Sequence, residues 1–289
     1  MRKILTALAC VGVTLSLLPA FMAPAHALDV SIGPAVWYAW WTPAFWKEWS
    51  RGDADDTVTK RDFNSTFLFG PALAVSFSPK WSLTGVFMWT GWYRAEKTKI
   101  DVGDNQRSED SLDISKYDLD TALNYTINRY CKLFGGVKYQ GYTYRDRGKD
   151  YDLTTGVLLD SYSNRLYWRS IGPGAGIGVT VPLSQSVFLL VNVSGIFLYS
   201  AFEGMEDDFD NDQKWVYTSY GANGSLSLAW YVDSMTTTIS LGARYQYLHN
   251  NRNSRRSDAI TDPDDTDPFD GNADRFYGLT FSAVYSFEL

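Results

Sequence analysis

Cysteine is scarce in this sequence, with two residues among 289. Cys10 lies in an N-terminal segment that we expect to be removed, and Cys131 alone cannot form an internal disulfide, which excludes a small disulfide-stapled domain. No apolar run of 18 residues follows that segment, so a membrane-spanning helix is excluded. Basic residues are in deficit, 26 Lys and Arg against 33 Asp and Glu, which argues against nucleic acid as a partner.

The N-terminal segment has the pattern of a secretory signal peptide. Arg2 and Lys3 precede an apolar run over 4–18, and Ala25-His26-Ala27 has the small-x-small form of a signal-peptidase site. We therefore expect 1–27 to be a signal peptide and 28–289 to be the mature domain. Cys10 comes before the apolar run ends, which does not favour a lipoprotein.

After residue 28, apolar and polar residues alternate with a period of two, and helical periodicity is hard to find. Most of the segments are longer than the five or six residues usual in soluble sheets, and they cover the roughly 9 to 11 residues that cross a bilayer at a tilt. The pattern predicts ten strands, over 30–41, 63–78, 81–94, 115–128, 130–144, 165–182, 186–201, 215–231, 236–249 and 276–289.

The connections alternate between short and long. Short turns follow residues 78, 128, 182 and 232, whereas the long polar segments are 42–62, 95–114, 145–164, 202–214 and 250–275. Short turns at one end, long loops at the other and an even strand number are typical of an outer-membrane barrel. We predict an all-β, transmembrane, antiparallel up-and-down barrel of about ten strands with these five loops outside the cell. Eight or twelve strands are alternatives, because 151–162 either extends a hairpin or adds two strands.

The last strand resembles a known signal. The terminal YGLTFSAVYSFEL places Tyr277, Leu279, Phe281 and Tyr285 on one face and Thr280, Ser282 and Ser286 on the other. This segment resembles the C-terminal β-signal of Gram-negative outer-membrane barrel proteins, although it ends in Leu289 where an aromatic residue is most common. The resemblance implies the outer membrane of a Gram-negative bacterium as location. It also implies membrane lipid, lipopolysaccharide and the barrel assembly machinery as partners, and leaves the oligomeric state open.

Tryptophan is concentrated in VWYAWWTPAFWKEW, residues 36–49. Aromatic residues near both ends of the predicted strands suggest two interface belts, an outer one with Trp89, Trp92, Tyr93, Trp168, Tyr199 and Trp215 and an inner one with Trp81, Tyr130 and Trp230. The strand phase turns Trp37 and Trp41 inward, where a belt does not explain them. They are candidates for binding a ligand in the lumen, as are Trp46 and Trp49 in the first loop.

Charged and amide side chains also face inward. The strand turns place Lys138 opposite Asp120, Gln140 opposite Asp118 and Arg244 opposite Asn223. These six residues, with Trp37 and Trp41, are the candidate lumen-binding residues. A salt-bridged plug is favoured over an open channel, because eight strands already pack solid or hold one small ligand.

Gly-Pro occurs inside three predicted strands, at Gly33-Pro34, Gly70-Pro71 and Gly172-Pro173. Proline cannot donate to the strand ladder, so we expect a bulge at each pair. Each proline falls in the lipid-facing phase. The preceding glycines either make room for bulky inward side chains, the favoured interpretation, or leave a slot for a ligand.

The 202–214 loop is strongly acidic. Asp208, Asp210 and Asp212 resemble the opening of a calcium loop, but Gln213 and Ser219 stand where that motif needs Gly and Glu. We expect no cofactor. Solvation of the outer surface is favoured over a loose divalent cation site in the extracellular loops.

Few residues are available as a catalytic base, because His249 is the only histidine after the expected cleavage. Ten strands match the omptin proteases in number, but the corresponding loop, EGMEDDFDNDQK, lacks the histidine which that family pairs with an aspartate. We therefore expect a non-enzymatic barrel, either a narrow porin-like channel or a structural, surface-exposed protein. The alternatives are a transporter for small hydrophobic molecules and a lipid- or protein-modifying enzyme using His249.

Overall fold

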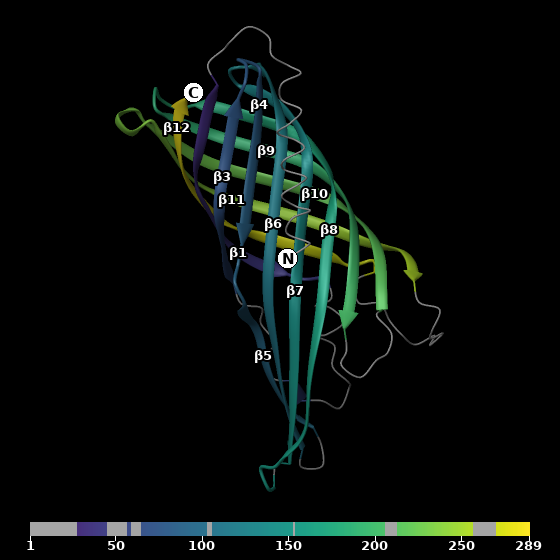
Figure 1. Ribbon diagram of the computed structural model, residues 1–289. Helices are drawn as coiled ribbons and strands as arrows, with labels where there is room; N and C mark the ends of the chain where they lie inside the picture. Colours follow the sequence, from purple (N-terminus) through teal and green to yellow (C-terminus); the bar gives the residue numbers. More distant parts are fainter. Residues whose placement is uncertain are drawn as a thin grey trace.

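The computed structural model describes residues 28–44, 57–58, 65–102, 106–152, 154–205, 213–256 and 270–289. They form a closed antiparallel barrel of ten strands, as the sequence predicts (Figure 1). The strands are β1 (Asp29–Thr42), β3 (Thr66–Ser76), β4 (Trp81–Trp89), β6 (Gln106–Asn128), β7 (Cys131–Asp152), β8 (Leu158–Pro182), β9 (Val187–Met205), β10 (Gln213–Val232), β11 (Thr237–Arg256) and β12 (Ala273–Glu288). Each pairs with its neighbour in chain order, and β1 pairs with β12 to close the barrel.

Two further strands lie beyond the barrel wall. β4 pairs with the 117–125 part of β6, and β5 (Tyr93–Val102) takes over as partner of the 106–114 part. The two-residue β2 (Thr57–Val58) pairs with β5. Figure 1 shows β5, β6, β7 and β8 reaching together far past the other strands, away from the end where the C-terminus lies.

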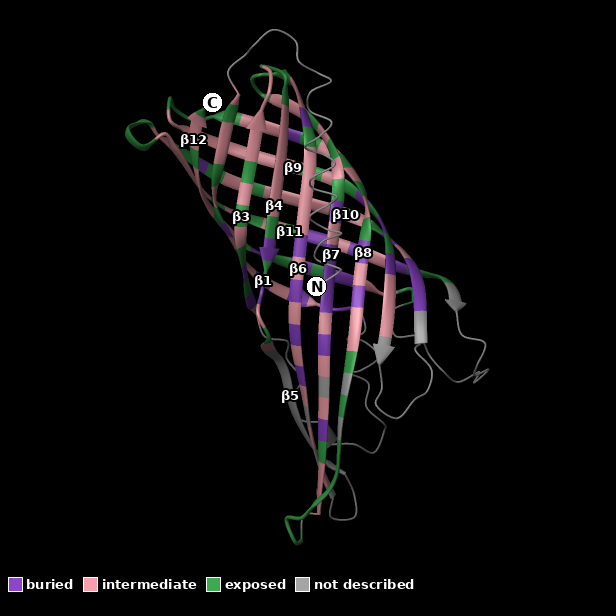
Figure 2. Ribbon diagram, in the orientation of Figure 1, coloured by how far each residue is buried: buried purple, intermediate pink, exposed green. Residues whose placement is uncertain are grey.

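The period-two alternation of the sequence is the alternation of burial in the structure (Figure 2). Trp37, Ala39 and Trp41 of β1 are buried, whereas Leu279 and Phe281 of β12 are about half exposed on the outer face. A polypeptide normally cannot leave so many large apolar side chains exposed to water, so the outer face is the one that meets lipid. The inward and outward phases predicted for the last strand are confirmed.

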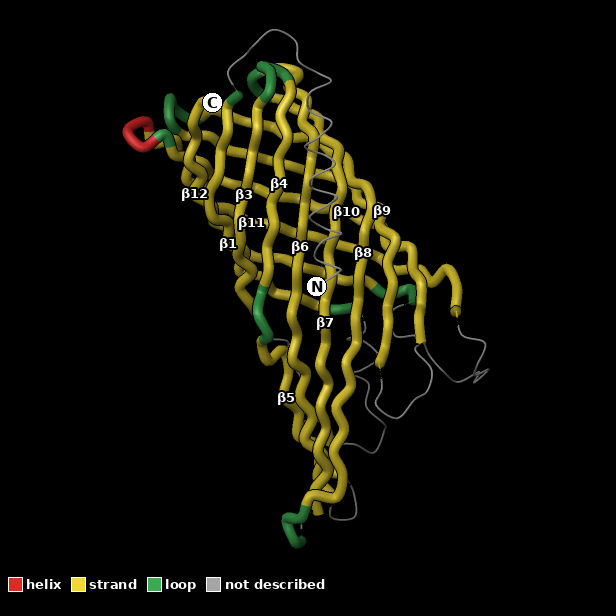
Figure 3. The backbone as a smooth tube through the Cα atoms, in the orientation of Figure 1, coloured by secondary structure: helices red, strands yellow, loops and turns green. Residues whose placement is uncertain are grey.

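Four short turns lie at the end of the barrel that also holds the C-terminus, and the described turn between β7 and β8 lies at the opposite end (Figure 3). In one turn, Asn128 Oδ1 accepts hydrogen bonds from the backbone N–H groups of Tyr130 and Cys131, at 2.9 and 3.0 Å. The turn before β11 is a 3-10 helix, Asp233–Met235. No described helix is long and apolar enough to cross a membrane.

Two segments predicted as long polar loops, 95–114 and 145–164, are mainly strand. They extend β5 and β6, and β7 and β8, into hairpins. β8 has 25 residues, a length of roughly 80 Å at about 3.3 Å per residue, whereas the apolar band of a barrel is about 25 Å tall. Of the two alternatives for 151–162, the hairpin extension is the one observed, since the described residues of this segment add no further strand to the barrel.

The lipid-facing phase of the long strands shows where the membrane ends. On β8 the outward residues are apolar from Val181 to Ile171 and then become Arg169 and Arg165. On β7 the same phase changes to Thr143, Arg145, Arg147 and Lys149. The outer parts of β5 to β8 therefore form an antiparallel sheet, here called the distal sheet, that stands beyond the lipid-facing band.

The bulges predicted at the three Gly-Pro pairs are wrong. The register continues unchanged past Gly33-Pro34, Gly70-Pro71 and Gly172-Pro173, and only the two pairings at each position are missing on one side. The strands thus accommodate the absent N–H group of each proline without an inserted residue. Pro34 and Pro71 lie opposite one another, exposed on the outer face. Register shifts among the described strands occur elsewhere, at 94/96, 126/128, 150/151 and 216/217.

Glycine at these pairs makes room for backbone. A Cβ on Gly33 would collide with the carbonyl oxygen of Ala283, and one on Gly70 or Gly172 would collide with that of Phe87 or Phe197. A neighbouring carbonyl therefore fills the place that a side chain would take. At Gly176 an aromatic ring lies close as well, because an added Cβ would lie 2.7 Å from Phe134 Cζ and nearer still to the carbonyl oxygen of Val193.

Candidate functional site

Aromatic side chains fill the half of the lumen nearest the long hairpins. Trp41 stacks on Tyr142 and on Phe276, with ring centroids 4.9 and 5.4 Å apart, and Tyr142 lies 5.9 Å from Phe276. Trp37 adds a tilted contact with Phe276 at 6.1 Å. These four rings, here called the aromatic layer, come from β1, β7 and β12 and are all buried. They bridge the lumen with rings at van der Waals spacing.

Two tryptophans expected in the outer belt belong inside. Trp168 and Trp215 are 2% and 7% exposed and pack in the same core as Trp37 and Trp41. Their aromatic character alone does not distinguish a belt position from a core position. The belt itself is confirmed at Trp89, Trp92 and Tyr199 on one side and at Trp81, Tyr130 and Trp230 on the other, all of which are exposed.

Asp274 holds the aromatic layer in place. Its Oδ1 accepts hydrogen bonds from Trp41 Nε1 at 3.2 Å and from the backbone N–H of Ala44 at 3.0 Å, and its Oδ2 accepts one from Asn250 Nδ2 at 3.2 Å. The sequence analysis did not single out Asp274. The available signal was its phase, because Asp274 is in step with the inward residues Phe276 and Gly278.

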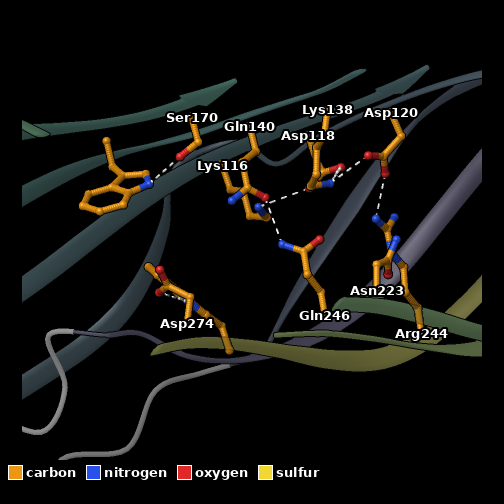
Figure 4. Close-up of polar contacts among 12 residues, drawn as sticks. Lys116, Asp118, Asp120, Lys138, Gln140, Ser170, Asn223, Arg244, Gln246 and Asp274 are labelled. Atoms are coloured by element: carbon orange, nitrogen blue, oxygen red, sulfur yellow. Dashed lines mark hydrogen bonds and ion pairs between the residues drawn. The ribbon is translucent and has the colours of Figure 1, made fainter. Parts of the chain in front are cut away.

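A network of ions lies in the lumen next to the aromatic layer, and Figure 4 shows its members. Lys138 Nζ donates to Asp118 at 2.8 Å and to Asp120 at 2.9 Å, and Lys116 Nζ lies 3.4 Å from Asp118. Arg244 Nη2 donates to Asp120 Oδ2 at 2.7 Å, which joins β11 to β6 across the lumen. The ion network therefore connects opposite walls of the barrel.

Cation–π contacts join the two layers. Lys116 Nζ lies 4.4 Å from the ring centroid of Tyr142 and 4.5 Å from that of Phe276. The Arg244 guanidinium lies 4.7 Å from the centroid of the Trp37 ring. A desolvated contact of this kind contributes on the order of 2 kcal/mol, so the ions and the rings stabilise each other.

The structure brings together all eight predicted lumen residues. The pairings of Lys138 with Asp120 and of Gln140 with Asp118 are those predicted. The register of Arg244 was predicted wrongly, because its partner on β10 is Ser225. The 3-10 turn at 233–235 sets this register, and Asn223 instead reaches Arg244 diagonally, with Asn223 Oδ1 accepting from Arg244 Nε at 3.2 Å.

Amide and hydroxyl groups complete the polar interior. Gln246 Nε2 donates to Gln140 Oε1 at 3.0 Å across the lumen. Ser200 contacts both Ser170 and Ser219 at 2.8 Å, and Ser219 donates to Asn250 Oδ1 at 2.6 Å. Serine is common on any lumen face, so no sequence signal distinguishes these three.

Below the ion network the lumen opens into a cavity of about 410 Å³. Asp120, Lys138 and Arg244 form part of its lining, and the rest is mainly Ser, Thr, Asn, Gly and Ala, with Lys132 and Phe134. The lumen therefore has two parts, a filled half toward the long hairpins and a hollow half toward the short turns.

The remaining candidates lie elsewhere. Asp208, Asp210 and Asp212 fall outside the described residues, as do Trp46 and Trp49. Within the described ranges no group of three His, Cys, Asp or Glu residues could hold a metal ion. His249 is in the outward phase of β11, where its ring lies 5.3 Å from that of Tyr220.

The sequence matches no family model and no curated protein. Among solved structures, the chain is similar to the outer membrane protease OmpT from Escherichia coli, with 10% identity over 91% of this chain and 97% of that chain and a TM-score of 0.51. It is also similar to the translocator domain of the autotransporter NalP from Neisseria meningitidis, with 10% identity, 99% and 98% coverage and a TM-score of 0.42.

At 10% identity the likeness to OmpT shows the fold alone. The class is nevertheless defined, because a closed antiparallel barrel with an apolar outer face, two aromatic belts and short turns at one end is an outer-membrane β-barrel. Lipid is therefore the environment of its outer face.

Proposed function

We propose that this protein is a non-enzymatic outer-membrane barrel that does not conduct and that anchors the distal sheet at the cell surface. The observation that carries the proposal is the filled half of the lumen, where the aromatic layer lies directly on the ion network. The barrel is then a support, and its exposed sheet is the part that meets other molecules.

Physical size supports a closed lumen. Ten strands enclose little more than eight do, and eight pack solid with side chains. The stacked rings of Trp41, Tyr142 and Phe276 leave no width for a hydrated ion between them. Separating Lys138 from Asp118 would leave buried charges unpaired, which typically costs about 3 to 5 kcal/mol.

The distal sheet supports a surface role. Its outward positions on β7 are polar, and Arg145 stacks on Trp92 at 4.5 Å while Arg147 lies 3.5 Å from Asp113. Long regular strands cost chain entropy to order, and these continue well beyond the length that crosses lipid. Their regular order supports a sheet that presents a surface to other molecules, rather than loops whose only role is to connect strands.

Planar-bilayer recording of the purified protein tests the proposal. We expect no stable channels from the wild type. A variant carrying Trp41→Ala and Phe276→Ala removes two rings of the aromatic layer, and we expect it to conduct, which shows that the assay detects an opened lumen. Stable channels in the wild type would overturn the proposal and favour the narrow porin-like channel.

Two other functions have less support. A lateral gap at the Gly-Pro pairs would favour transport of small hydrophobic molecules, but the register there is continuous. A hydrolase using His249 would need a partner on the outward face of β11, where its described ring contact is Tyr220. Lipase or protease activity in the wild type that is lost in His249→Ala would replace our proposal with the enzyme.

A further inference from the structure

The cavity contains a row of polar side chains that neither the aromatic layer nor the ion network uses. Lys132 on β7 is in register with Gly178 on β8, which is in register with Asn192 on β9. Asn192 is in register with Ser225 on β10, and Ser225 with Arg244 on β11. This line of in-register residues thus carries a cation at each end, an amide and a hydroxyl between them, and a bare glycine.

Gly178 lets the row come together. A Cβ at this position would lie 2.6 Å from Lys132 Cε and 2.7 Å from Asn192 Oδ1. Both side chains therefore lean across the space above the glycine. Asn192 Nδ2 also donates to Ser225 Oγ at 3.3 Å, which fixes the direction of the amide. The side chains of the row are ordered by their contacts with one another.

The row has more donors than acceptors. Lys132 forms no ion pair with any described residue, whereas Lys116, Lys138 and Arg244 each contact Asp118 or Asp120. Arg244 uses Nε and Nη2 for Asn223 and Asp120, and its Nη1 donors make no hydrogen bond within the described chain. Lys132 and Arg244, which have N–H groups to spare, thus both line one cavity.

We propose that this row binds a small soluble anion that carries a carboxylate or phosphate group. The anion would lie in the cavity between Lys132 and Arg244, with Asn192 and Ser225 as further hydrogen-bonding groups. Charge-assisted hydrogen bonds of this kind are about twice as strong as neutral ones. The cavity volume of about 410 Å³ falls at the lower end of the range for small-molecule sites.

The anion reaches the site from the end of the short turns. The inward residues there are small, and Ser31, Ser82, Thr126 and Ser286 are all partly exposed. The route rests on the proposed closure of the opposite half, but binding itself does not. Conductance tests the closure and titration tests the site, so either can fail alone.

The experiment is calorimetric titration of the folded, purified full-length protein in detergent, at constant ionic strength, with inorganic phosphate and separately with succinate. We expect saturable binding of one anion per barrel by at least one probe. Lys132→Met removes one of the two positive charges of the row and should weaken binding at least tenfold. Lys80→Met removes a charge from an exposed turn outside the cavity and should leave binding unchanged.

Gly178→Ala provides a second variant that keeps every charge. The added methyl group displaces the ends of Lys132 and Asn192, so we expect it to weaken binding of the same probe while the heat-modifiable gel migration of the folded barrel is retained. The proposal is overturned if neither probe binds the wild type at 10 mM, or if the wild type and Lys132→Met bind equally well. Weaker binding in Lys80→Met as well would also overturn it, because general charge would then explain the effect.

Discussion

At the scale of the residue, the interior is held together by charges that are paired in a confined space. Asp118 and Lys138 are 0% and 4% exposed at their side chains. Buried ion pairs add little net stability over apolar packing, but the loss of one partner leaves a charge without compensation. Loss of one charged partner should therefore destabilise the ion network, whereas replacement of both partners by apolar residues should be tolerated.

Asp118→Asn tests this sensitivity. The change removes the carboxylate shared by Lys138 and Lys116, so we expect the free energy of unfolding to fall by about 3 to 5 kcal/mol, measured by urea unfolding in lipid vesicles. Asp113→Asn is the control, since its pair with Arg147 is partly exposed and should contribute less than about 1 kcal/mol. Equal losses in the two variants would contradict a buried network.

Gly33→Ala tests the close approach of strands at a Gly-Pro pair. Its Cβ meets the carbonyl oxygen of Ala283, so β12 must move, and overpacking of this kind costs about 1 to 3 kcal/mol. Gly195→Ala is the matched control, because nothing lies within 4 Å of its added Cβ. Comparable unfolding curves for the two variants would show that β1 and β12 separate easily at the proline.

At the scale of the element, strand phase decides which side chains meet lipid and which meet the lumen. β11 illustrates this, because Leu241 is 62% exposed on the outer face while its neighbour Ser240 lines the cavity and contacts Ser282 at 2.7 Å. A step of one residue along the strand moves a side chain from lipid to the polar lumen. The same rule explains why the lipid-facing band ends where arginine enters the outward phase of β8.

Leu241→Arg and Ser240→Arg together test the phase of β11. An arginine against lipid near the midplane costs about 2 to 4 kcal/mol, so Leu241→Arg should lower the free energy of unfolding in vesicles by that amount. Ser240→Arg places the same side chain in a polar cavity and should cost much less. Similar costs would mean that β11 is turned the other way.

At the scale of the whole molecule, the barrel and the distal sheet are stabilised by different contacts. The barrel is closed by the β1–β12 pairing and by mutual backbone hydrogen bonds of Leu28 and Leu289, at 2.9 and 3.3 Å. The distal sheet adds no strand to that closure. It is stabilised by strand pairing within β5 to β8 and by its own turn, in which Asp152 Oδ1 accepts from the N–H groups of Thr154 and Thr155.

Shortening the hairpin of β7 and β8 tests this separation. Arg147 and Ser163 are in register, so replacing residues 148–162 with a two-residue Asn-Gly turn keeps the strand pairing below them. We expect the variant to fold, with wild-type heat-modifiable gel migration and an unfolding midpoint in vesicles close to that of the full chain. Failure to form a folded barrel would show that the distal sheet is needed for assembly.

The sequence by itself indicated about ten strands and the inward face of most of them, because a period of two assigns each side chain to lipid or lumen. Trp168 and Trp215 were exceptions, since their place in the core did not follow from the pattern. The sequence also placed Lys138 against Asp120, since a tight turn fixes the register of its strands. Only the tertiary structure decided what meets across the barrel. The stack of Trp41, Tyr142 and Phe276, the reach of Arg244 to Asp120 and the anchoring role of Asp274 join strands far apart in the chain. Barrel closure brings these strands together, and no local pattern encodes the distance between opposite walls.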